Sequence, residues 1–201
     1  NRAIRPFAQN CVATLTVALI SASVAGAASP LPTGSSPKPI EAPHFPDRLH
    51  TFVWRNWESA DLPAMARLLG TTEDKVREIG ESMGLPAHFP ISETQKQRGY
   101  ISLIRRNWHL LNYDQLLDLL GWDAEKIGYT LKEDDFFWIK LGSLKPDCPP
   151  LRYEPPNETA KKRCAEIKEL VTRHFGEAFK QPAQPRFAFV DELSKPLPDF
   201  A

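Results

Sequence analysis

The residues of this 201-residue sequence that are best suited to chemistry are the aromatic and basic side chains in its middle. All five tryptophans lie between Trp54 and Trp138, and Arg105 and Arg106 come just before one of them. Indole rings pack on the faces of sugar rings, and guanidinium groups bind carboxylates and phosphates. The pattern therefore indicates ligand binding rather than a reaction.

The tryptophans divide into two groups. Trp57 and Trp108 each follow the dipeptide Arg-Asn and occupy matching positions of an internal repeat, so we expect both in the core. Trp54 and Trp122 have no matching tryptophan, and the repeat does not require either of them. These two are the candidate sugar-stacking residues, with burial in the core as the alternative.

Basic and amide side chains accompany the tryptophans. Arg105 and Arg106, together with Arg55, could bind an anion, although pairing with the many nearby acids is the simpler interpretation. The matching Asn56 and Asn107 are expected to cap or brace the backbone rather than to recognise a ligand.

No catalytic constellation accompanies these residues. Asp134-Asp135 and Glu73-Asp74 are sequence neighbours, which do not face each other on a helix. The five histidines lack metal-ligand spacing, and no nucleophile triad, phosphate loop or dinucleotide fingerprint is present. We therefore expect no catalytic residue, no metal and no cofactor in this stretch.

The N-terminus has the layout of a secretory signal peptide over residues 1–27. Arg2 and Arg5 precede an uncharged apolar run over 11–24, and Ala25-Gly26-Ala27 offers small residues to a signal peptidase. An uncleaved membrane anchor and a buried helix are the alternatives. The layout predicts a secreted, periplasmic or cell-envelope protein that touches a membrane only through an uncleaved segment.

Cleavage would leave two cysteines, Cys148 and Cys164. In an oxidising compartment such a pair predicts one disulfide, which would stabilise the fold by about 3 kcal/mol. Two free thiols are the alternative.

Charge and proline content divide the chain. The 25 basic and 25 acidic residues cancel, which argues against a general polyanion binder but does not exclude a local basic patch. Most of the 19 prolines lie outside the segment 47–145. The predicted organisation is a Pro/Ser-rich linker (28–46), a helical domain (47–145), a Pro-rich connection (146–156), and a helix and tail leading to a further domain (157–201), with a short strand over 187–190.

The helical domain contains a repeat with an offset of 51 residues. Arg-Asn-Trp at 55–57 recurs at 106–108, and Leu-Leu-Gly at 68–70 recurs at 119–121. Each unit, about 52–85 and 103–136, reads as two helices joined by a glycine turn. The expected N-caps are Asp61, Thr72, Asn112 and Asp123, the expected C-caps are Gly70 and Gly121, and Ser92 with Gln95 forms a capping box. The predicted fold is mainly α, with two helix-turn-helix-like repeats.

A helix-turn-helix pattern raises the alternative of a DNA-binding module. The second helix of such a unit must carry basic or amide side chains into the major groove. Residues 71–83 hold four acids and two bases, and residues 122–135 hold five acids and two bases. These surfaces would be repelled by phosphates, so we expect no nucleic-acid partner.

The Arg-Asn-Trp, Leu-Leu-Gly and Gly-Leu-Pro elements, with residues 105–111 and 139–148, carry a resemblance over about 48–195. The chain resembles the N-terminal helical region of large secreted bacterial proteins, some with a glycoside-hydrolase-like domain downstream. The resemblance implies a non-catalytic exported module, structural or interacting, in front of a carbohydrate-active enzyme. Its partner would be that downstream domain or a polysaccharide, and no catalytic residue is transferred.

Overall fold

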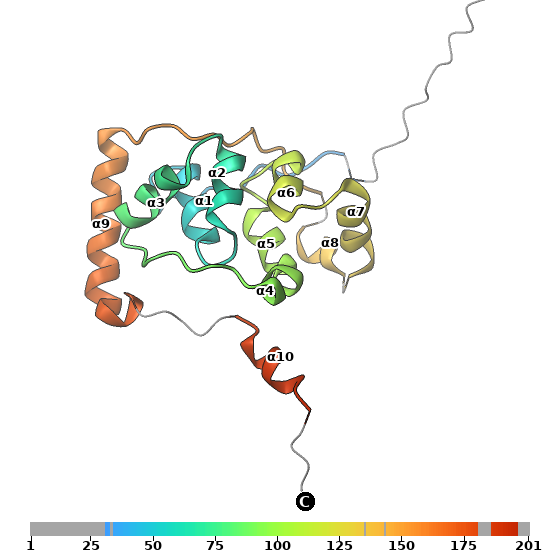
Figure 1. Ribbon diagram of the computed structural model, residues 1–201. Coiled ribbons are helices and arrows are strands. Elements are labelled where there is room, and N and C mark those ends of the chain that lie inside the picture. The colour runs from blue at the N-terminus through green and yellow to red at the C-terminus, as the bar shows by residue number, and fades with distance from the viewer. Residues whose placement is uncertain (1–30, 33, 135, 143, 181–185, 197–201) are drawn as a thin grey trace, which may run out of the picture.

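The chain is mainly α-helical in the computed structural model, which describes residues 31–32, 34–134, 136–142, 144–180 and 186–196. The predicted signal peptide lies outside the described residues. No strand occurs within these ranges. The helices are α1 (Arg48–Asn56), α2 (Leu62–Leu69), α3 (Glu73–Ser82), α4 (Glu93–Arg98), α5 (Tyr100–Asn107), α6 (Tyr113–Leu120), α7 (Ala124–Glu133), α8 (Phe137–Lys140), α9 (Glu158–Phe175), η1 (Gly176–Lys180) and α10 (Ala188–Leu193) (Figure 1).

Most of the expected helix caps form. The side chains of Thr72, Asn112 and Asp123 each accept a hydrogen bond from the backbone amide three residues on. Gly70 and Gly121 end α2 and α6 in the left-handed conformation, with φ of 68° and 64°, which glycine adopts without steric cost. Local sequence therefore sets where these helices begin and end.

Two caps differ from the expectation. Asp61 precedes α2 but makes no side-chain cap bond, because its carboxylate accepts from the amide of Ile91 and pairs with Lys96. Ser92 accepts from the amide of Gln95 at 3.2 Å. The Gln95 side chain donates to the Glu58 carbonyl at 2.6 Å instead of returning to Ser92, so only half of the capping box forms.

Two pairs of helices at an offset of about 51 residues contact each other. α2 and α6 have bounds 51 residues apart, as do α3 and α7. α1 packs on α5, and α2 packs on α6. Arg67 of α2 pairs with Asp118 of α6 at 3.0 Å, and these two positions are again 51 apart. These contacts join the two segments of the domain through α1 with α5 and α2 with α6.

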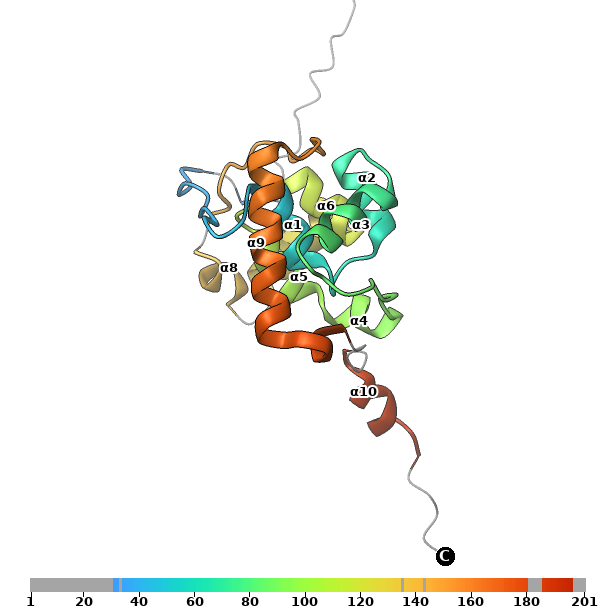
Figure 2. The same ribbon diagram turned by 90° about the vertical axis from the view of Figure 1, so that its left-hand side faces the viewer.

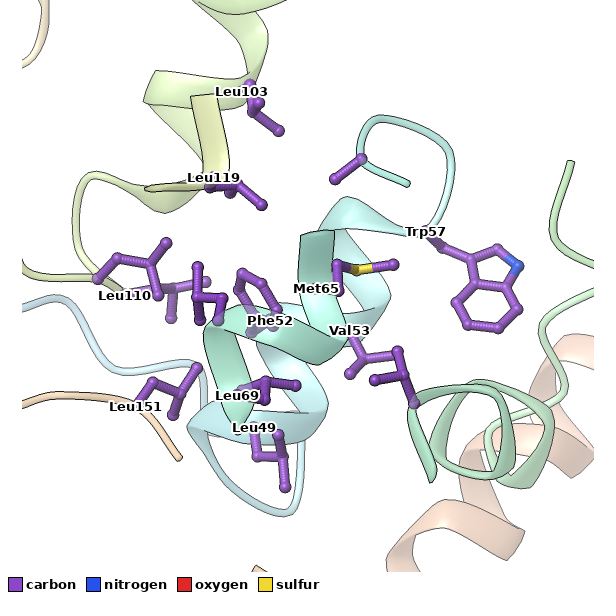
Figure 3. Packing of buried hydrophobic residues seen from close by; sticks show 14 of the residues in the cluster. Leu49, Phe52, Val53, Trp57, Met65, Leu69, Leu103, Leu110, Leu119 and Leu151 are labelled. Atoms are coloured by element: carbon purple, nitrogen blue, oxygen red, sulfur yellow. The ribbon is translucent and has the colours of Figure 1, made fainter. Parts of the chain in front are cut away.

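One apolar core spans both units. Phe52, Met65, Ile104, Leu116 and Ile127 are each fully buried, and Figure 3 shows side chains from α1, α2, α5 and α6 meeting there. Trp57 and Trp108 are 2% and 1% exposed, which confirms their predicted place in the core.

The long helix α9 belongs to the same core. It packs against α3 (Figure 2), and its buried side chains are Ala160, Cys164, Ile167 and Val171. Gly84, just after α3, has φ of +85°, and a Cβ there would lie 3.2 Å from the backbone of Lys168. The core therefore continues beyond the boundary expected at residue 145.

The expected Pro-rich connection is an extended segment held on the domain. The amide of Leu151 donates to the side chain of Gln115 at 2.8 Å, and Gln115 donates back to the Leu151 carbonyl at 2.6 Å. The amide of Tyr153 donates to the carbonyl of Leu69 at 2.9 Å. These bonds fix the path of the chain between the second unit and α9.

Two further expectations need correction. Residues 188–193 form the helix α10 and not a strand. Cys148 and Cys164 are both free and buried, so the expected disulfide is not formed in the structure. The physical reason is that the thiols have different surroundings: Cys148 lies 3.9 Å from the ammonium of Lys145, and Cys164 contacts Ser82 of α3.

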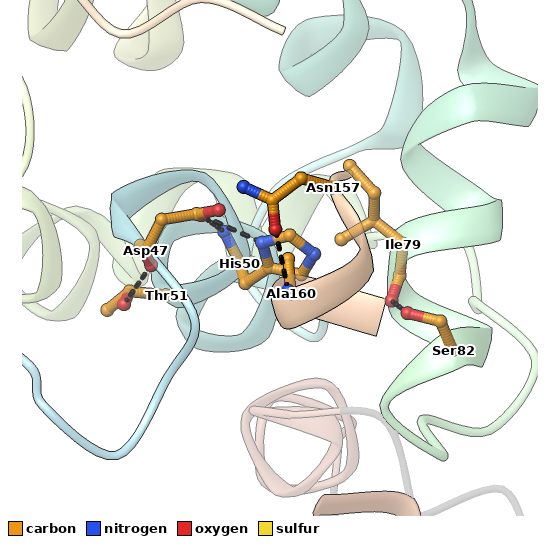
Figure 4. Close-up of polar contacts among 7 residues, drawn as sticks. All are labelled: Asp47, His50, Thr51, Ile79, Ser82, Asn157 and Ala160. Atoms are coloured by element: carbon orange, nitrogen blue, oxygen red, sulfur yellow. Dashed lines mark hydrogen bonds and ion pairs between the residues drawn. The ribbon is translucent and has the colours of Figure 1, made fainter. Parts of the chain in front are cut away.

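The first turn of α1 depends on Asp47 (Figure 4). Its carboxylate accepts from the backbone amide of His50 at 2.9 Å and lies 2.7 Å from Nδ1 of the fully buried His50 ring. Burial alone would raise the pKa of Asp47, but the hydrogen bonds from His50 outweigh it and hold that pKa below its ordinary value of 3.8. The ionised carboxylate therefore contributes stability above pH 3.8, and this contribution is lost as pH falls through the lowered pKa.

Asp47→Ala is expected to lower the free energy of unfolding by about 1–2 kcal/mol at neutral pH, because it removes the cap and leaves Nδ1 of His50 unpaired. Urea unfolding at a series of pH values measures this. The difference in the free energy of unfolding between wild type and variant should become smaller below pH 3.8. Asp47→Asn keeps a capping oxygen and is the matched control; an equal loss in both variants would contradict the capping role.

Candidate functional site

The candidate site lies where α1 and α5 meet at their C-terminal ends. Arg55 and Arg106 occupy matching positions there and exchange hydrogen bonds. Nη1 of Arg106 donates to the carbonyl of Arg55 at 2.9 Å, and Nη1 of Arg55 donates to the carbonyl of Arg106 at 3.4 Å. Arg106 also contacts the hydroxyl of Ser59. A helix C-terminus favours positive charge, so both guanidinium groups are held in place.

A buried pair of asparagine side chains also connects α1 and α5 at this junction. Nδ2 of Asn56 donates to Oδ1 of Asn107 at 2.9 Å, and Nδ2 of Asn107 donates to Oδ1 of Asn56 at 2.7 Å. Each Nδ2 also donates to a backbone carbonyl one turn earlier, at 2.8 Å. Both residues are fully buried, which confirms that they brace the structure.

Beside this junction lies a pocket of about 260 Å³. Its walls combine aromatic and charged side chains from α1, α5 and the segment after α9. The lining residues are Trp54, Arg55, Trp57, Glu58, Leu85, Arg106 and Phe179. A pocket with an apolar wall and a few polar groups is the usual form of a small-ligand site.

The aromatic wall is held by its neighbours. Trp54 is half-buried and packs on Phe45, with ring centroids 5.6 Å apart. Nε1 of Trp57 donates to the carbonyl of Pro86 at 2.9 Å. Phe179 packs on Phe175 at 5.4 Å. These contacts give the pocket a fixed apolar surface.

The charged wall carries an excess of positive groups. Arg186, the first described residue after η1, is not a lining residue, but it pairs with Glu58 of the wall at 2.8 Å. Burial lowers the pKa of Arg106, and the nearby charges of Arg186 and Arg55 lower it further, while Glu58 opposes them. Three guanidinium groups thus share one carboxylate, and the group carries a net charge of about +2.

The structure unites two of the four predicted binding residues. Trp54 and Arg106 line the same pocket. Arg105 is exposed and is not among the lining residues. Trp122 lies elsewhere, half-buried between the ring of Tyr100 at 5.2 Å and the ammonium of Lys126 at 4.2 Å. The Trp122 ring is therefore already in contact with two other side chains.

Three contributors escaped the sequence reasoning: Glu58, Phe179 and Arg186. Glu58 is next to Trp57 in sequence, but nothing marked it among the many acids. Phe179 and Arg186 come from beyond α9, more than 120 positions after Trp54. Only the packing of α9 brings them to the site.

The second helix of the first unit, α3, provides no basic surface. On α3, Lys75 pairs with Glu78 at 2.7 Å, and Arg77 pairs with Asp74 in the same helix. The remaining acids, Glu73 and Glu81, leave α3 with a net negative charge. This geometry gives no support to the DNA-binding alternative.

The described residues contain no group of three or more His, Cys, Asp or Glu side chains that could hold a metal ion. None of their helices is long and apolar enough to cross a membrane.

Comparison with known proteins gives no information about this site. No known protein family matches the chain. Searches against curated proteins and against solved structures give no significant similarity.

Proposed function

We propose that this chain is a non-catalytic binding module that recognises a saccharide polymer through the Trp54 pocket. The observation that carries the proposal is the meeting of Trp54 and Arg106, 52 positions apart in sequence, in one pocket with Trp57 and Phe179. Aromatic rings offer a sugar a flat apolar contact, and guanidinium groups offer donors in a fixed planar geometry. The described residues that line the pocket include no acid–base pair and no nucleophile with a neighbouring base.

We further propose that the module is exported and stands in front of a carbohydrate-active enzyme. The signal-like segment 1–27 and the resemblance over 48–195 support this part. A downstream catalytic domain is then the second partner of the module. N-terminal sequencing of the protein secreted by an exporting bacterial host tests the first step, and an unprocessed protein retained in the cytoplasm would contradict it.

Trp54→Ala is expected to weaken polysaccharide binding by about tenfold, which corresponds to roughly 1.4 kcal/mol of lost ring contact. Affinity electrophoresis of the full chain through gels containing soluble polysaccharides measures the change. Trp122→Ala is the matched control, because it removes an indole that lies outside the pocket. Trp54→Phe keeps a ring and should retain most of the binding.

Circular dichroism and thermal unfolding show whether each variant is folded at the temperature of the assay. A folded Trp54→Ala variant that binds as well as the wild type would overturn the proposal. Equal losses in Trp54→Ala and Trp122→Ala would do the same, because the effect would not belong to the pocket.

A further inference from the structure

We infer that the ligand of the Trp54 pocket carries an anionic group, a carboxylate or a sulfate ester on the sugar, and that Arg55, Arg106 and Arg186 hold it. The saccharide part of this inference rests on the proposed function. The anionic part rests on the arrangement of charges around Glu58.

Donors remain free for a ligand on two of these arginines. Each guanidinium has five N–H donors. Within the described part of the chain, Arg55 and Arg106 use only Nη1, for each other's carbonyls and for Ser59. Nε and Nη2 of both residues therefore remain for a carboxylate or sulfate, which guanidinium groups bind with two parallel hydrogen bonds.

Within the described part of the chain, Glu58 is the one carboxylate among the lining residues, and it is paired with Arg186. Arg106 is half-buried, and crowding by Arg55 and Arg186 disfavours its charge. An anion bound beside Glu58 would relieve this crowding, whereas a neutral sugar would leave it unchanged.

The size and the aromatic wall define the rest of the ligand. The volume of about 260 Å³ lies just below the roughly 300–1,000 Å³ of pockets for drug-sized molecules. It suits a single ring with one charged substituent. Trp54 and Phe179 offer an apolar contact to that ring, next to the arginines. A polymer of uronic acids or of sulfated sugars combines both features.

The test is a binding titration of the full chain with three probes: polygalacturonate for the carboxylate, dextran sulfate for the sulfate, and dextran as the neutral polymer. Arg55→Gln and Arg186→Gln should each weaken binding of the preferred acidic polymer by about threefold to fivefold. Glu58→Gln should strengthen it, because it removes the one opposing charge. Arg105→Gln is the matched control, since this exposed arginine neither lines the pocket nor pairs with Glu58, as Arg186 does.

The outcomes separate this inference from the proposed function. Equal binding of dextran and the acidic polymers, with no effect of Glu58→Gln, would overturn the anionic ligand and leave saccharide binding in place. Charge-dependent binding that is insensitive to Trp54→Ala would uphold the anion site and overturn the saccharide module. An effect of Arg105→Gln equal to that of Arg55→Gln would overturn the site, because binding would then be general electrostatic attraction. Binding of none of the polymers would overturn both.

Discussion

Replacing Asn56 by alanine is expected to destabilise the fold by about 3 kcal/mol. The substitution removes the bonds of 2.9 and 2.7 Å that the two amides exchange and the bond of Nδ2 to the Phe52 carbonyl. It also leaves Oδ1 and one N–H of Asn107 without a partner in a fully buried place. An unsatisfied buried polar group costs its full desolvation penalty, which is why the loss exceeds that of an ordinary hydrogen bond.

The matching substitution Asn107→Ala should cost a similar amount, because Asn107 makes the corresponding bond to the Leu103 carbonyl. Urea unfolding followed by tryptophan fluorescence measures both variants. The double variant should cost about 1–2 kcal/mol less than the sum of the single variants, because the second substitution removes a group that the first had already left unpaired.

Asn112→Ala is the matched control, since it deletes the same side chain at an N-cap outside this pair and should cost about 1 kcal/mol. Additive losses at Asn56 and Asn107 would show that the two amides do not depend on each other, and would contradict the paired geometry.

The helix boundaries followed from local sequence. Thr72, Asn112 and Asp123 each cap the helix that they were expected to begin. These features need only a few neighbouring residues, and capping bonds form within one turn. The burial of Trp57 and Trp108 followed from their matching positions, because a large ring at equivalent places serves packing.

The packing of the connecting segments could not be predicted from the sequence, because it depends on contacts between residues that are distant in sequence. Ala60 and Leu111 match at the offset of 51, and both carbonyls receive a side chain. His88 Nε2 bonds to the Ala60 carbonyl at 3.0 Å, and the ammonium of Lys145 bonds to the Leu111 carbonyl. His88 and Lys145 are 57 positions apart instead of 51, so the repeat does not predict that they make corresponding bonds.

The same two side chains also cover the matching tryptophans. The His88 ring packs edge-on against Trp57 with centroids 5.2 Å apart, and the Lys145 ammonium lies 5.5 Å from the ring centroid of Trp108. From the sequence, a lysine beside a Pro-rich stretch is expected to be an exposed linker residue. Lys145 is buried because its ammonium bonds to the carbonyls of Trp108 and Leu111, just after α5, which have no partner within the helix.

Only part of the candidate site could be predicted from the sequence, for a similar reason. Trp54 and Arg106 belong to helices whose contact follows from the repeat. Phe179 reaches the pocket, and Arg186 reaches Glu58 beside it, only because α9 packs on α3 and the chain turns back after α9. Trp122, the other candidate stacking residue, lies outside the pocket, beside Tyr100 and Lys126, and nothing in the sequence shows these contacts.

Gly80→Ala is expected to destabilise the fold by about 2 kcal/mol, against the direction of helix propensity. Gly80 lies within α3, where alanine alone would add about 1 kcal/mol of stability. A Cβ at this position would lie 2.9 Å from Cε3 of Trp57 and closer still to two other ring atoms. Overpacking of this kind costs about 1–3 kcal/mol or more, so the steric cost outweighs the gain.

The indole ring has little room to move away. Trp57 is 2% exposed, its Nε1 is bonded to the Pro86 carbonyl at 2.9 Å, and the His88 ring packs against it. Figure 3 shows it projecting from α1 toward α3. Since Trp57 also lines the candidate pocket, the same substitution should weaken ligand binding.

Urea unfolding again measures the effect, with Glu81→Ala as the matched control on the neighbouring exposed position, expected within about 0.5 kcal/mol of the wild type. In a Trp57→Leu background the cost of Gly80→Ala should disappear, because the smaller side chain leaves space for the added methyl group. A stabilising effect of Gly80→Ala in the wild-type background would show that helix propensity dominates at this position, and that the ring of Trp57 does not occupy the space beside Gly80.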